Sequence, residues 1–510
     1  MTYHRSYALA GVIVLLVLEW LVPLVFLGLT VLVLLITIGL VVFKVTNICM
    51  SGKLSPKHAH DPTYQPFVSI HMACCNEPSK TVGESLEYLA RLDYPNYEVI
   101  IIHNNNQDRE LQSSLELKCK KLGSRFHFLH EDHISGYKSG ALNYARKFMF
   151  KEAKYLAIID ADYHVMPNFL KENIGFFIDP KVAIVQIPQD YRDSKISKRC
   201  LALEYQSFFS IMMNTAEKVD AVTFTGTMGI LWADIFESKN IAWNEKCITE
   251  DTEIGIRIHA FGYKAIYIDK AYGNGIMPLS YASLREQRLR WGYGNAQIIA
   301  KDFLPIMFSY KLKLSQKMNF IGQLSYWLHP ELLLAIMYLM AAFMQLSHPN
   351  NTYLNLATYL IITSLLASLV GNFMYFVVGL SFTRGVRFTH SVRAFFVHCG
   401  LLTVMSISWL RFLFGKPLDF RVTPKANHIS EPKTGYRPEL TVIILLAIGL
   451  IVRYICVQDN FLEVVIVSAI IILILACIVY LNNQFKVRLT TSTDPSKKQQ
   501  SHRLQRLQDE

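Results

Sequence analysis

Residues 287–291 bring an amide, two guanidinium groups and an indole together directly before the apolar C-terminal half of the chain. Guanidinium groups pair bidentately with diphosphate oxygens, and an indole face stacks on the apolar face of a sugar ring. The segment therefore predicts a sugar-nucleotide site, in which Gln287, Arg288 and Arg290 contact the donor and Trp291 contacts the acceptor sugar. The alternative is a basic amphipathic helix that lies on a membrane surface.

Two carboxylates, Asp160 and Asp162, follow the apolar run 155–159. Oxygen ligands suit Mg²⁺ or Mn²⁺, so this pair predicts a divalent-cation site that neutralises a diphosphate leaving group. An Asp-x-Asp pair also occurs in ordinary loops, so the pair alone does not establish a cation site. Lys138 supports a phosphate site nearby, because the small residues in the segment 135–143 let a helix begin close to a phosphate that the lysine can reach.

Polar residues follow two other apolar runs. Asn76 and Glu77 come after residues 67–74, and Asn105 comes after residues 98–103. Asn, Asp and Pro favour turns, which is the plain interpretation. Ligands of open α/β sheets bind beyond the carboxyl ends of the strands, so these three side chains are also candidates for binding the donor.

Glu250 and Asp251 follow Thr249 at the start of a helical window. Carboxylates in a first helical turn interact favourably with the helix dipole, so a capped helix start explains them without any function. A catalytic role is the alternative.

The composition predicts an integral membrane protein. Of the 510 residues 52% are hydrophobic, and 51 Lys and Arg against 40 Asp and Glu give a net charge of +11. The basic excess lies largely beside apolar segments, which the positive-inside tendency explains, so we expect no nucleic-acid partner. Nine cysteines without a CxxC pair indicate neither a disulfide framework nor a zinc site.

The chain divides into five parts. Residues 1–45 predict two transmembrane helices joined near Glu19 and Pro23, and one long tilted helix is the alternative. Short apolar runs then alternate with amphipathic windows, the pattern of an α/β domain with a mainly parallel sheet. The parts after the first are a linker at 46–65, the α/β domain at 66–304, interfacial and transmembrane helices at 305–482, and a basic disordered tail at 483–510.

Within the α/β domain we expect strands at 67–74, 98–103, 126–129, 155–159 and 182–187, with helices at 81–92 and 138–151. The C-terminal half has apolar stretches at 320–346, 353–380, 392–414, 440–457 and 461–481. Basic residues flank both ends of the third stretch, so we expect 392–414 to lie at the interface or to re-enter, which leaves about six crossings in all. A plain transmembrane helix is the alternative.

Taken in order, these motifs resemble those of the membrane-integrated family 2 glycosyltransferases, which include the cellulose, curdlan, chitin and hyaluronan synthases. The matching elements are Asn76-Glu77-Pro78, Lys138 in Gly-x-Lys-x-Gly-Ala-Leu-Asn, Asp160 with Asp162, Gly226 in Phe-Thr-Gly-Thr, Thr249-Glu250-Asp251, and Gln-x-x-Arg-Trp at 287–291. Residues 420–425 resemble the Phe-x-Val-Thr-x-Lys gating loop of cellulose synthases, which implies that Thr423 and Lys425 close over the diphosphate from a loop at 415–427.

The resemblance implies a GT-A fold for the α/β domain, inserted in an α-helical transmembrane domain. It implies a metal-dependent inverting transferase that moves a hexose from a UDP-sugar to a growing β-glucan and exports the polysaccharide through its own pore, with glucose as the preferred sugar. Asp251 then acts as the general base with Glu250 beside it, and Gly226 lies at the acceptor. The implied setting is a bacterial plasma membrane with a cytosolic catalytic domain and auxiliary export subunits as candidate partners.

One departure from the family pattern affects the donor. Many relatives have an acidic pair after the second strand to bind uracil, whereas this chain has His103-Asn104-Asn105. A UDP-GlcNAc-dependent polysaccharide synthase and a non-processive lipid glycosyltransferase therefore stay as alternatives. A transporter whose soluble domain only binds nucleotide-sugar is an alternative of another class.

Overall fold

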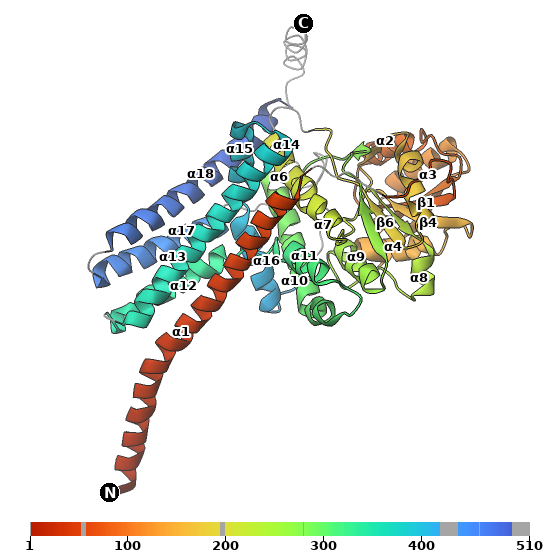
Figure 1. The fold of residues 1–510 in the computed structure, drawn as a ribbon. Coiled ribbons are helices and arrows are strands. Elements are labelled where there is room, and N and C mark those ends of the chain that lie inside the picture. The colour runs from red at the N-terminus through yellow and green to blue at the C-terminus, as the bar shows by residue number, and fades with distance from the viewer. Residues whose placement is uncertain are drawn as a thin grey trace.

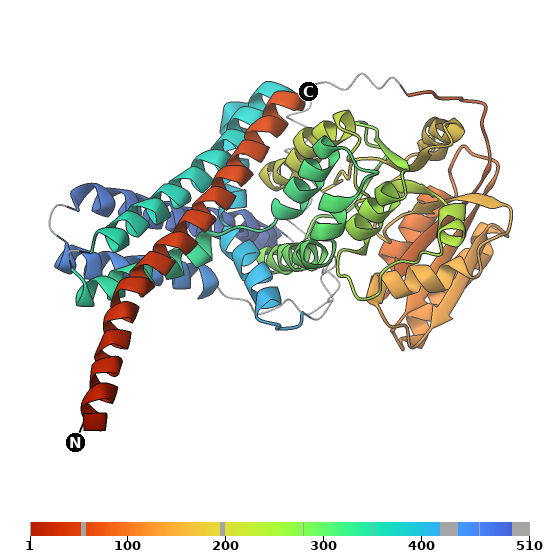
Figure 2. The same ribbon diagram turned by 60° about the horizontal axis from the view of Figure 1, so that its bottom comes forward.

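The computed structural model describes residues 2–52, 58–193, 199–278, 280–349, 351–418, 437–457 and 460–491, with side chains from residue 21 to residue 481. An α/β domain lies beside a bundle of long helices, and both views show the two side by side (Figures 1 and 2). The first helix, α1 (Thr2–Met50), runs along the bundle. It packs on α13, where the Lys44 ammonium donates to Asn372 Oδ1 at 2.6 Å.

A seven-stranded sheet forms the centre of the α/β domain, in the order β3-β2-β1-β4-β7-β6-β8. Its strands are β1 (Phe67–Cys74), β2 (Tyr97–Asn104), β3 (Phe126–Glu131), β4 (Ala153–Ile158), β6 (Val182–Gln186), β7 (Gly229–Trp232) and β8 (Lys264–Tyr267). Strand β7 runs antiparallel to both β4 and β6, and every other neighbouring pair is parallel. The mainly parallel sheet is therefore confirmed, whereas β7 was not predicted.

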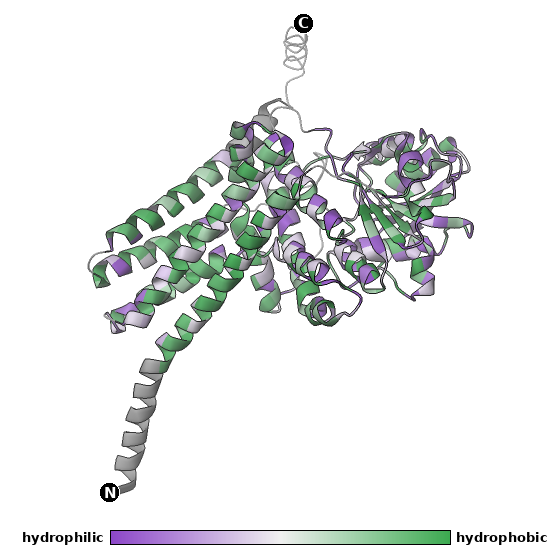
Figure 3. Cartoon of the chain, viewed as in Figure 1, coloured by the Kyte–Doolittle hydropathy of each residue, from purple (hydrophilic) through white to green (hydrophobic). Residues whose placement is uncertain are grey.

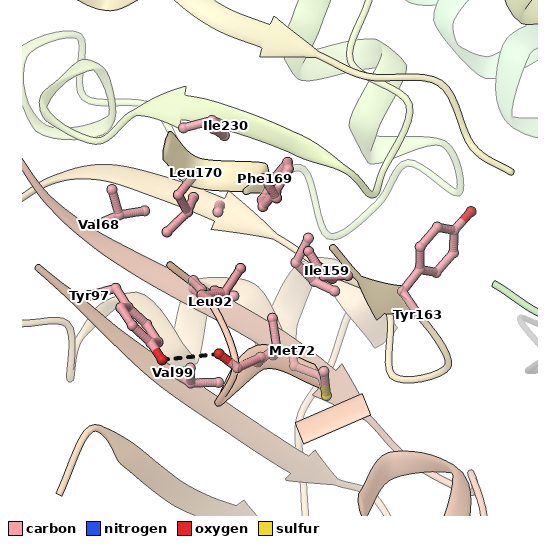
Figure 4. Close-up of a cluster of buried hydrophobic side chains, with 14 of the residues drawn as sticks. Val68, Met72, Leu92, Tyr97, Val99, Ile159, Tyr163, Phe169, Leu170 and Ile230 are labelled. Atoms are coloured by element: carbon pink, nitrogen blue, oxygen red, sulfur yellow. Dashed lines mark hydrogen bonds between the residues drawn. The ribbon is translucent and has the colours of Figure 1, made fainter. Parts of the chain in front are cut away.

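The strands are apolar because helices cover the sheet on both sides, and all of β2 is buried. Figure 4 shows part of this core, to which Val68, Met72 and Val99 belong. Within it, the Tyr97 hydroxyl donates to the carbonyl of Leu89 at 3.0 Å. The helices and short strands of this domain are α2 (Ser79–Leu89), α3 (Arg109–Leu122), α4 (Tyr137–Arg146), β5 (His164–Val165), α5 (Phe169–Asn173), α6 (Arg199–Ser207), α7 (Asn214–Lys218), α8 (Asp234–Ser238), α9 (Glu250–Ala260), β9 (Gly273–Asn274) and α10 (Tyr281–Phe308).

Hydrophobic residues predominate along the bundle helices (Figure 3), and many of their large apolar side chains are exposed. Its helices after α10 are α11 (Leu314–Ser325), α12 (Glu331–Ser347), α13 (Thr352–Phe373), α14 (Leu380–Arg384), α15 (Phe388–Cys399), α16 (Leu402–Leu413), α17 (Arg437–Cys456) and α18 (Phe461–Thr491). Within the part of the chain that the structure describes, five helical segments are long and apolar enough to cross a membrane: Leu21–Met50, Thr352–Arg384, Phe388–Leu413, Pro438–Cys456 and Phe461–Leu481. The chain is an integral membrane protein.

The N-terminal pair of helices predicted from sequence is wrong, because α1 is one continuous helix with Pro23 inside it. Proline removes one backbone hydrogen bond, but no glycine or asparagine lies between Glu19 and Pro23 to let the chain reverse. The predicted disordered tail also needs correction, since α18 continues to Thr491. Residues 483–491 contain helix-forming Gln, Lys, Arg and Leu, which extend the preceding apolar helix.

The stretch 392–414 forms two helices, α15 and α16, separated at Gly400. Helix α15 packs on α6 and α18, and α16 packs closely on α10, where a Cβ on Gly292 would overlap Ser408. The segment is long and apolar enough to cross a membrane, so the interfacial placement stays a prediction.

Candidate active site

Lys138, in the first turn of α4, joins two of the predicted site segments. Its ammonium lies 2.5 Å from Asp160 Oδ1, just after β4, and donates to the carbonyl of Gly226 at 2.8 Å. Burial alone would lower the pKa of Lys138, but the charges of Asp160 and then Glu250 outweigh it and raise that pKa. The charged Lys138 side chain therefore lies between the loop after β4 and the loop around Gly226, at the carboxyl edge of the sheet.

Asp251, in the first turn of α9, faces the same loop. Gly226 has a φ of +82°, and a Cβ there would lie 2.7 Å from Asp251 Oδ2. Glu250 is buried and Asp251 is half-buried. Burial raises the pKa of both carboxyls, and for Glu250 the charge of Asp251 adds to the effect. A half-buried carboxylate with a raised pKa has the properties of a general base.

Replacing Gly226 by alanine should reduce turnover by roughly 100-fold, because the new methyl group displaces the Asp251 carboxylate by a few tenths of an ångström or more. Steady-state transfer rates would measure the loss. Gly123→Ala is the matched control, since Gly123 also has a positive φ, of +103°, but its Cβ would meet no atom within 4 Å. Equal loss of activity in both variants would show that backbone strain, and not the contact with Asp251, is responsible.

The loop around Gly226 is fixed from the sheet side by Gln186, which sequence reasoning missed. The buried Gln186 side chain accepts from the Thr225 amide at 3.0 Å and donates to the Thr227 carbonyl at 3.0 Å. The Thr227 hydroxyl in turn accepts from the Asp160 amide at 3.0 Å. Gln186 is thus a positioning residue, and its only sequence signal is an amide inside an otherwise apolar strand.

Asp162 is turned into the protein and is 1% exposed. Its Oδ2 accepts from the Ile276 amide at 2.8 Å, and its carbonyl accepts from Arg192 at 2.6 Å. Among the described residues, no three His, Cys, Asp or Glu side chains form a group that could hold a metal ion. The two carboxylates therefore form no closed metal cage. Asp160 is half-buried and is the oxygen ligand that fits a hard cation taking its remaining ligands from a diphosphate, whereas Asp162 is engaged inside the protein.

The loops after β1 and β2 are bonded to each other. Glu77 accepts from the Cys75 amide at 2.7 Å, and Asn106 donates both to the Cys75 carbonyl at 2.6 Å and to Asn76 Oδ1 at 3.0 Å. The structure therefore places Asn76 and Glu77 together at the carboxyl edge of the sheet, and their role in binding the donor stays a prediction.

Asn105 has a φ of +54° and connects this edge to the segment before α4. Its side chain donates to the Ile134 carbonyl at 2.8 Å and accepts from the Ile134 amide at 2.7 Å. One donor and one acceptor of the amide are thus used within the protein. Asn105 lies on the rim of the predicted donor site, but its role in binding the base stays a prediction.

Arg288 does not lie where the sequence predicted. It is 1% exposed and forms a buried ion pair with Glu204 of α6, between the ring faces of Tyr205 and Trp291 at 4.2 and 4.3 Å. Burial alone would raise the pKa of Glu204, but the charge of Arg288 outweighs it and holds that pKa low. Since a buried guanidinium needs a close counter-charge, the prediction that Arg288 binds diphosphate is contradicted.

The other residues of 287–291 lie around this ion pair. Gln287 accepts from the Tyr205 hydroxyl, and the half-buried Trp291 packs edge-on against Trp327 at 5.0 Å. Arg290 is 9% exposed, and burial lowers its pKa to about 10 against the opposing charges of Glu286 and Glu250. Of the two predicted arginines, Arg290 is therefore the one whose charge interacts with Glu250 of α9.

The structure thus brings one group of the predicted residues together and places a second group away from it. Lys138, Asp160, Gly226, Glu250 and Asp251 meet at the carboxyl edge of the sheet, with Arg290 nearby. Gln287, Arg288 and Trp291 lie where α10 meets α6, and Thr423 and Lys425 lie outside the described residues. Sequence reasoning also missed Glu204, whose only signal is a single acid in an apolar window.

Curated relatives, a solved structure and two family models all relate this chain to glycosyltransferases. Curated relatives include "Probable glucomannan 4-beta-mannosyltransferase 15" of Arabidopsis thaliana, 26% identical over 265 residues, which are 49% of this chain and 48% of the relative. "Glucomannan 4-beta-mannosyltransferase 7" of the same plant is 27% identical over 264 residues, 49% of this chain and 47% of the relative. The chain spans about half the length of the curated relatives it matches.

The fold has a solved counterpart. The mannosyltransferase PcManGT from Pyrobaculum calidifontis, solved in complex with GDP-Man and Mn²⁺, superposes with a TM-score of 0.50 at 17% identity, over 77% of this chain and all of the other. The family model described as Glycosyl transferase family 2 matches residues 69–238, which confirms the GT-A assignment of the α/β domain. A second model, Glycosyl transferase family group 2, matches residues 155–478, from β4 through most of the bundle and more than half of the chain. The chain belongs to the glycosyl transferase family group 2.

Proposed function

We propose that the protein transfers a hexose, with inversion, from a nucleoside-diphosphate sugar to a hydroxyl of a growing β-glycan. The observation that carries this proposal is the position of Asp251, a half-buried carboxylate held against Gly226 and close to Lys138 and Asp160. Its environment favours a carboxylate that accepts a proton, and the adjacent cations favour a departing diphosphate.

In the proposed reaction, Asp251 takes the proton of the acceptor hydroxyl as that oxygen attacks the anomeric carbon. The bond between this carbon and the diphosphate oxygen breaks on the opposite face, so an α-linked donor gives a β-linked product. Lys138 and Arg290 stabilise the negative charge that develops on the diphosphate. Asp160, on the loop that Asp162 fixes through the Ile276 amide, would hold Mg²⁺ or Mn²⁺, and a cation there would supply positive charge for the leaving diphosphate.

Two donors have support. The resemblance of residues 420–425 to the gating loop of cellulose synthases favours UDP-glucose, whereas the relatives named mannosyltransferases and the solved counterpart with GDP-Man favour GDP-mannose. Asn105, in place of an acid, offers uracil an uncharged partner only. We therefore place the protein among the synthases of β-glucan or β-mannan, with the sugar to be decided by assay.

The donor assay uses the full chain in lipid nanodiscs with labelled UDP-glucose, GDP-mannose and UDP-GlcNAc. We expect one of the two hexose donors to give a polymer that a linkage-specific β-glycosidase degrades. A UDP-GlcNAc polymer or a single sugar on lipid would identify one of the rival enzymes. Passage of intact nucleotide-sugar across the bilayer, without any transfer, would overturn the proposal in favour of a transporter.

Removal of divalent cations with EDTA should reduce transfer at least about tenfold, because the cation stabilises the leaving diphosphate by several kcal/mol. Re-addition of Mg²⁺ or Mn²⁺ should restore the rate. Calorimetric titration with the nucleoside diphosphate gives a second measurement, in which cation-dependent binding should be lost in an Asp160→Asn variant. Full activity and unchanged nucleotide affinity in EDTA would contradict metal dependence.

The helical bundle is the proposed route of the product. A catalytic domain that draws on nucleotide-sugars would lie in the cytosol, with the bundle in the plasma membrane and the glycan leaving through it. Auxiliary export subunits remain candidate partners of this route. Glycan trapped inside sealed vesicles, or released from them, would measure the direction of transport.

A further inference from the structure

Residues 243–249 lead directly into α9, whose first turn carries Asp251. We call them the segment before α9. They form neither helix nor strand, so no regular ladder of hydrogen bonds holds their backbone in place. Backbone N–H and carbonyl groups of such a segment need other partners. Two amide side chains supply them, one from α4 and one from α10.

Asn143, in α4, binds the start of the segment before α9. Its Oδ1 accepts from the Trp243 amide at 3.0 Å, and its Nδ2 donates to the Trp243 carbonyl at 3.0 Å. The Trp243 ring is buried and lies 5.8 Å from the ring of Phe224, two residues before Gly226. The start of the segment is therefore fixed both to α4 and to the chain that leads into the Gly226 loop.

Gln297, in α10, binds the end of the segment before α9. Its Oε1 accepts from the Ile248 amide at 3.0 Å, and its Nε2 donates to the Lys246 carbonyl at 3.1 Å. Gly294 lies three residues earlier and so on the same face of α10. A Cβ on Gly294 would lie 2.5 Å from Thr249 Oγ1. Helix α10 therefore lies directly against the last residue before α9.

The two contacts have the same form. An amide side chain offers one acceptor and one donor group, so it can pair with a backbone N–H and a backbone carbonyl as a neighbouring strand would. Asn143 thereby ties the segment before α9 to α4, which carries Lys138, and Gln297 ties it to α10. Figure 1 shows α9 between α4 and α10. The segment is thus held from both sides immediately before the helix that carries Asp251.

We propose that Asn143 and Gln297 are positioning residues, which hold Asp251 at the place relative to Lys138 and the Gly226 loop where it can take the proton of the acceptor hydroxyl. The inference rests on the proposed function, because it takes Asp251 as the base. Neither amide contacts the reacting atoms. Hydrogen bonds of this kind also satisfy an ordinary loop, and a role in loop stability alone would not act through Asp251.

The test is a double-mutant cycle in the full chain in nanodiscs. Gln297→Met alone should lower kcat about 10- to 100-fold, because a base displaced by about 1 Å transfers the proton poorly. In the Asp251→Asn background the same substitution should change the residual kcat by less than about twofold, since no base remains to be displaced. Asn143→Leu should behave in the same way from the α4 side. An equal fold-loss in both backgrounds would overturn the proposal, because the effect would then not act through Asp251.

Calorimetric titration with UDP and GDP shows whether the variants keep the donor site. The affinity that the unmodified chain has should stay within a factor of about three, and its loss in both variants would count against a role confined to Asp251. Asn96→Ala is the matched control, because Asn96 also donates to a backbone carbonyl, that of Gln65 at 2.7 Å, but at the start of β2. Its kcat should not change. If both amide variants keep kcat while Asp251→Asn loses it, this inference is wrong and the proposed function stands. If Asp251→Asn itself keeps turnover, the proposed function fails and this inference with it.

Discussion

Replacing Asp251 by asparagine should lower the rate of transfer by a factor of about 10² to 10⁴, the usual contribution of a general base. The amide has nearly the same shape, so the packing against Gly226 and the Thr252 amide contact at 2.8 Å should remain. What is lost is the ability to accept the proton of the attacking hydroxyl. Steady-state rates at saturating donor would measure the effect.

The donor should still bind to this variant, because the phosphate-binding cations are unchanged. Asp234→Asn is the matched control, since Asp234 is also in the first turn of a helix but is exposed on α8. Wild-type turnover in the Asp251 variant would refute its role as the base. Loss of donor binding together with turnover would instead assign Asp251 to the donor site.

Replacing Glu204 by alanine should lower the free energy of unfolding by about 3–5 kcal/mol, the usual effect of removing one partner of a buried ion pair. Arg288 would then be a buried guanidinium without its carboxylate, and His398, which lies 3.2 Å from the other oxygen of Glu204, would lose a partner as well. Chemical unfolding of the detergent-solubilised protein would measure the change.

Two controls separate the buried charge from ordinary truncation. Asp93→Ala removes the exposed pair with Lys171, and it should cost no more than about 1 kcal/mol. A Glu204→Leu/Arg288→Met double variant should be more stable than Glu204→Ala, because it leaves no uncompensated charge. If Glu204→Ala is as mild as Asp93→Ala, the ion pair does not hold α6 and α10 together.

Local sequence patterns predict the helices and strands whose ends are marked by neighbouring residues. Strand β1 was predicted at 67–74 and runs over Phe67–Cys74, because an apolar run there ends at turn-forming residues. Strand β7 was missed, since four residues beginning with glycine give no clear pattern. The sequence predicts a turn in the N-terminal apolar stretch near Pro23, but α1 is continuous there because the residues that flank the single proline continue the helix.

The candidate site, too, could be predicted from local sequence patterns only in part. The types and order of Lys138, Asp160 and Asp251 predict one common site, and the structure brings the three side chains together, while their roles stay predictions. The partner of Arg288 could not be predicted, because Glu204 lies 84 positions earlier and only the packing of α6 on α10 brings the two together. A motif shows which groups are present, whereas the fold decides which charges neutralise each other.

The stereochemistry of transfer tests the central claim most directly. The purified chain would be given an α-linked nucleotide-hexose and a short acceptor, and the anomeric configuration of the new bond would be read by NMR. A single displacement assisted by Asp251 predicts a β-linked product. An α-linked product would contradict it, because retention requires a route that one general base at this position does not provide.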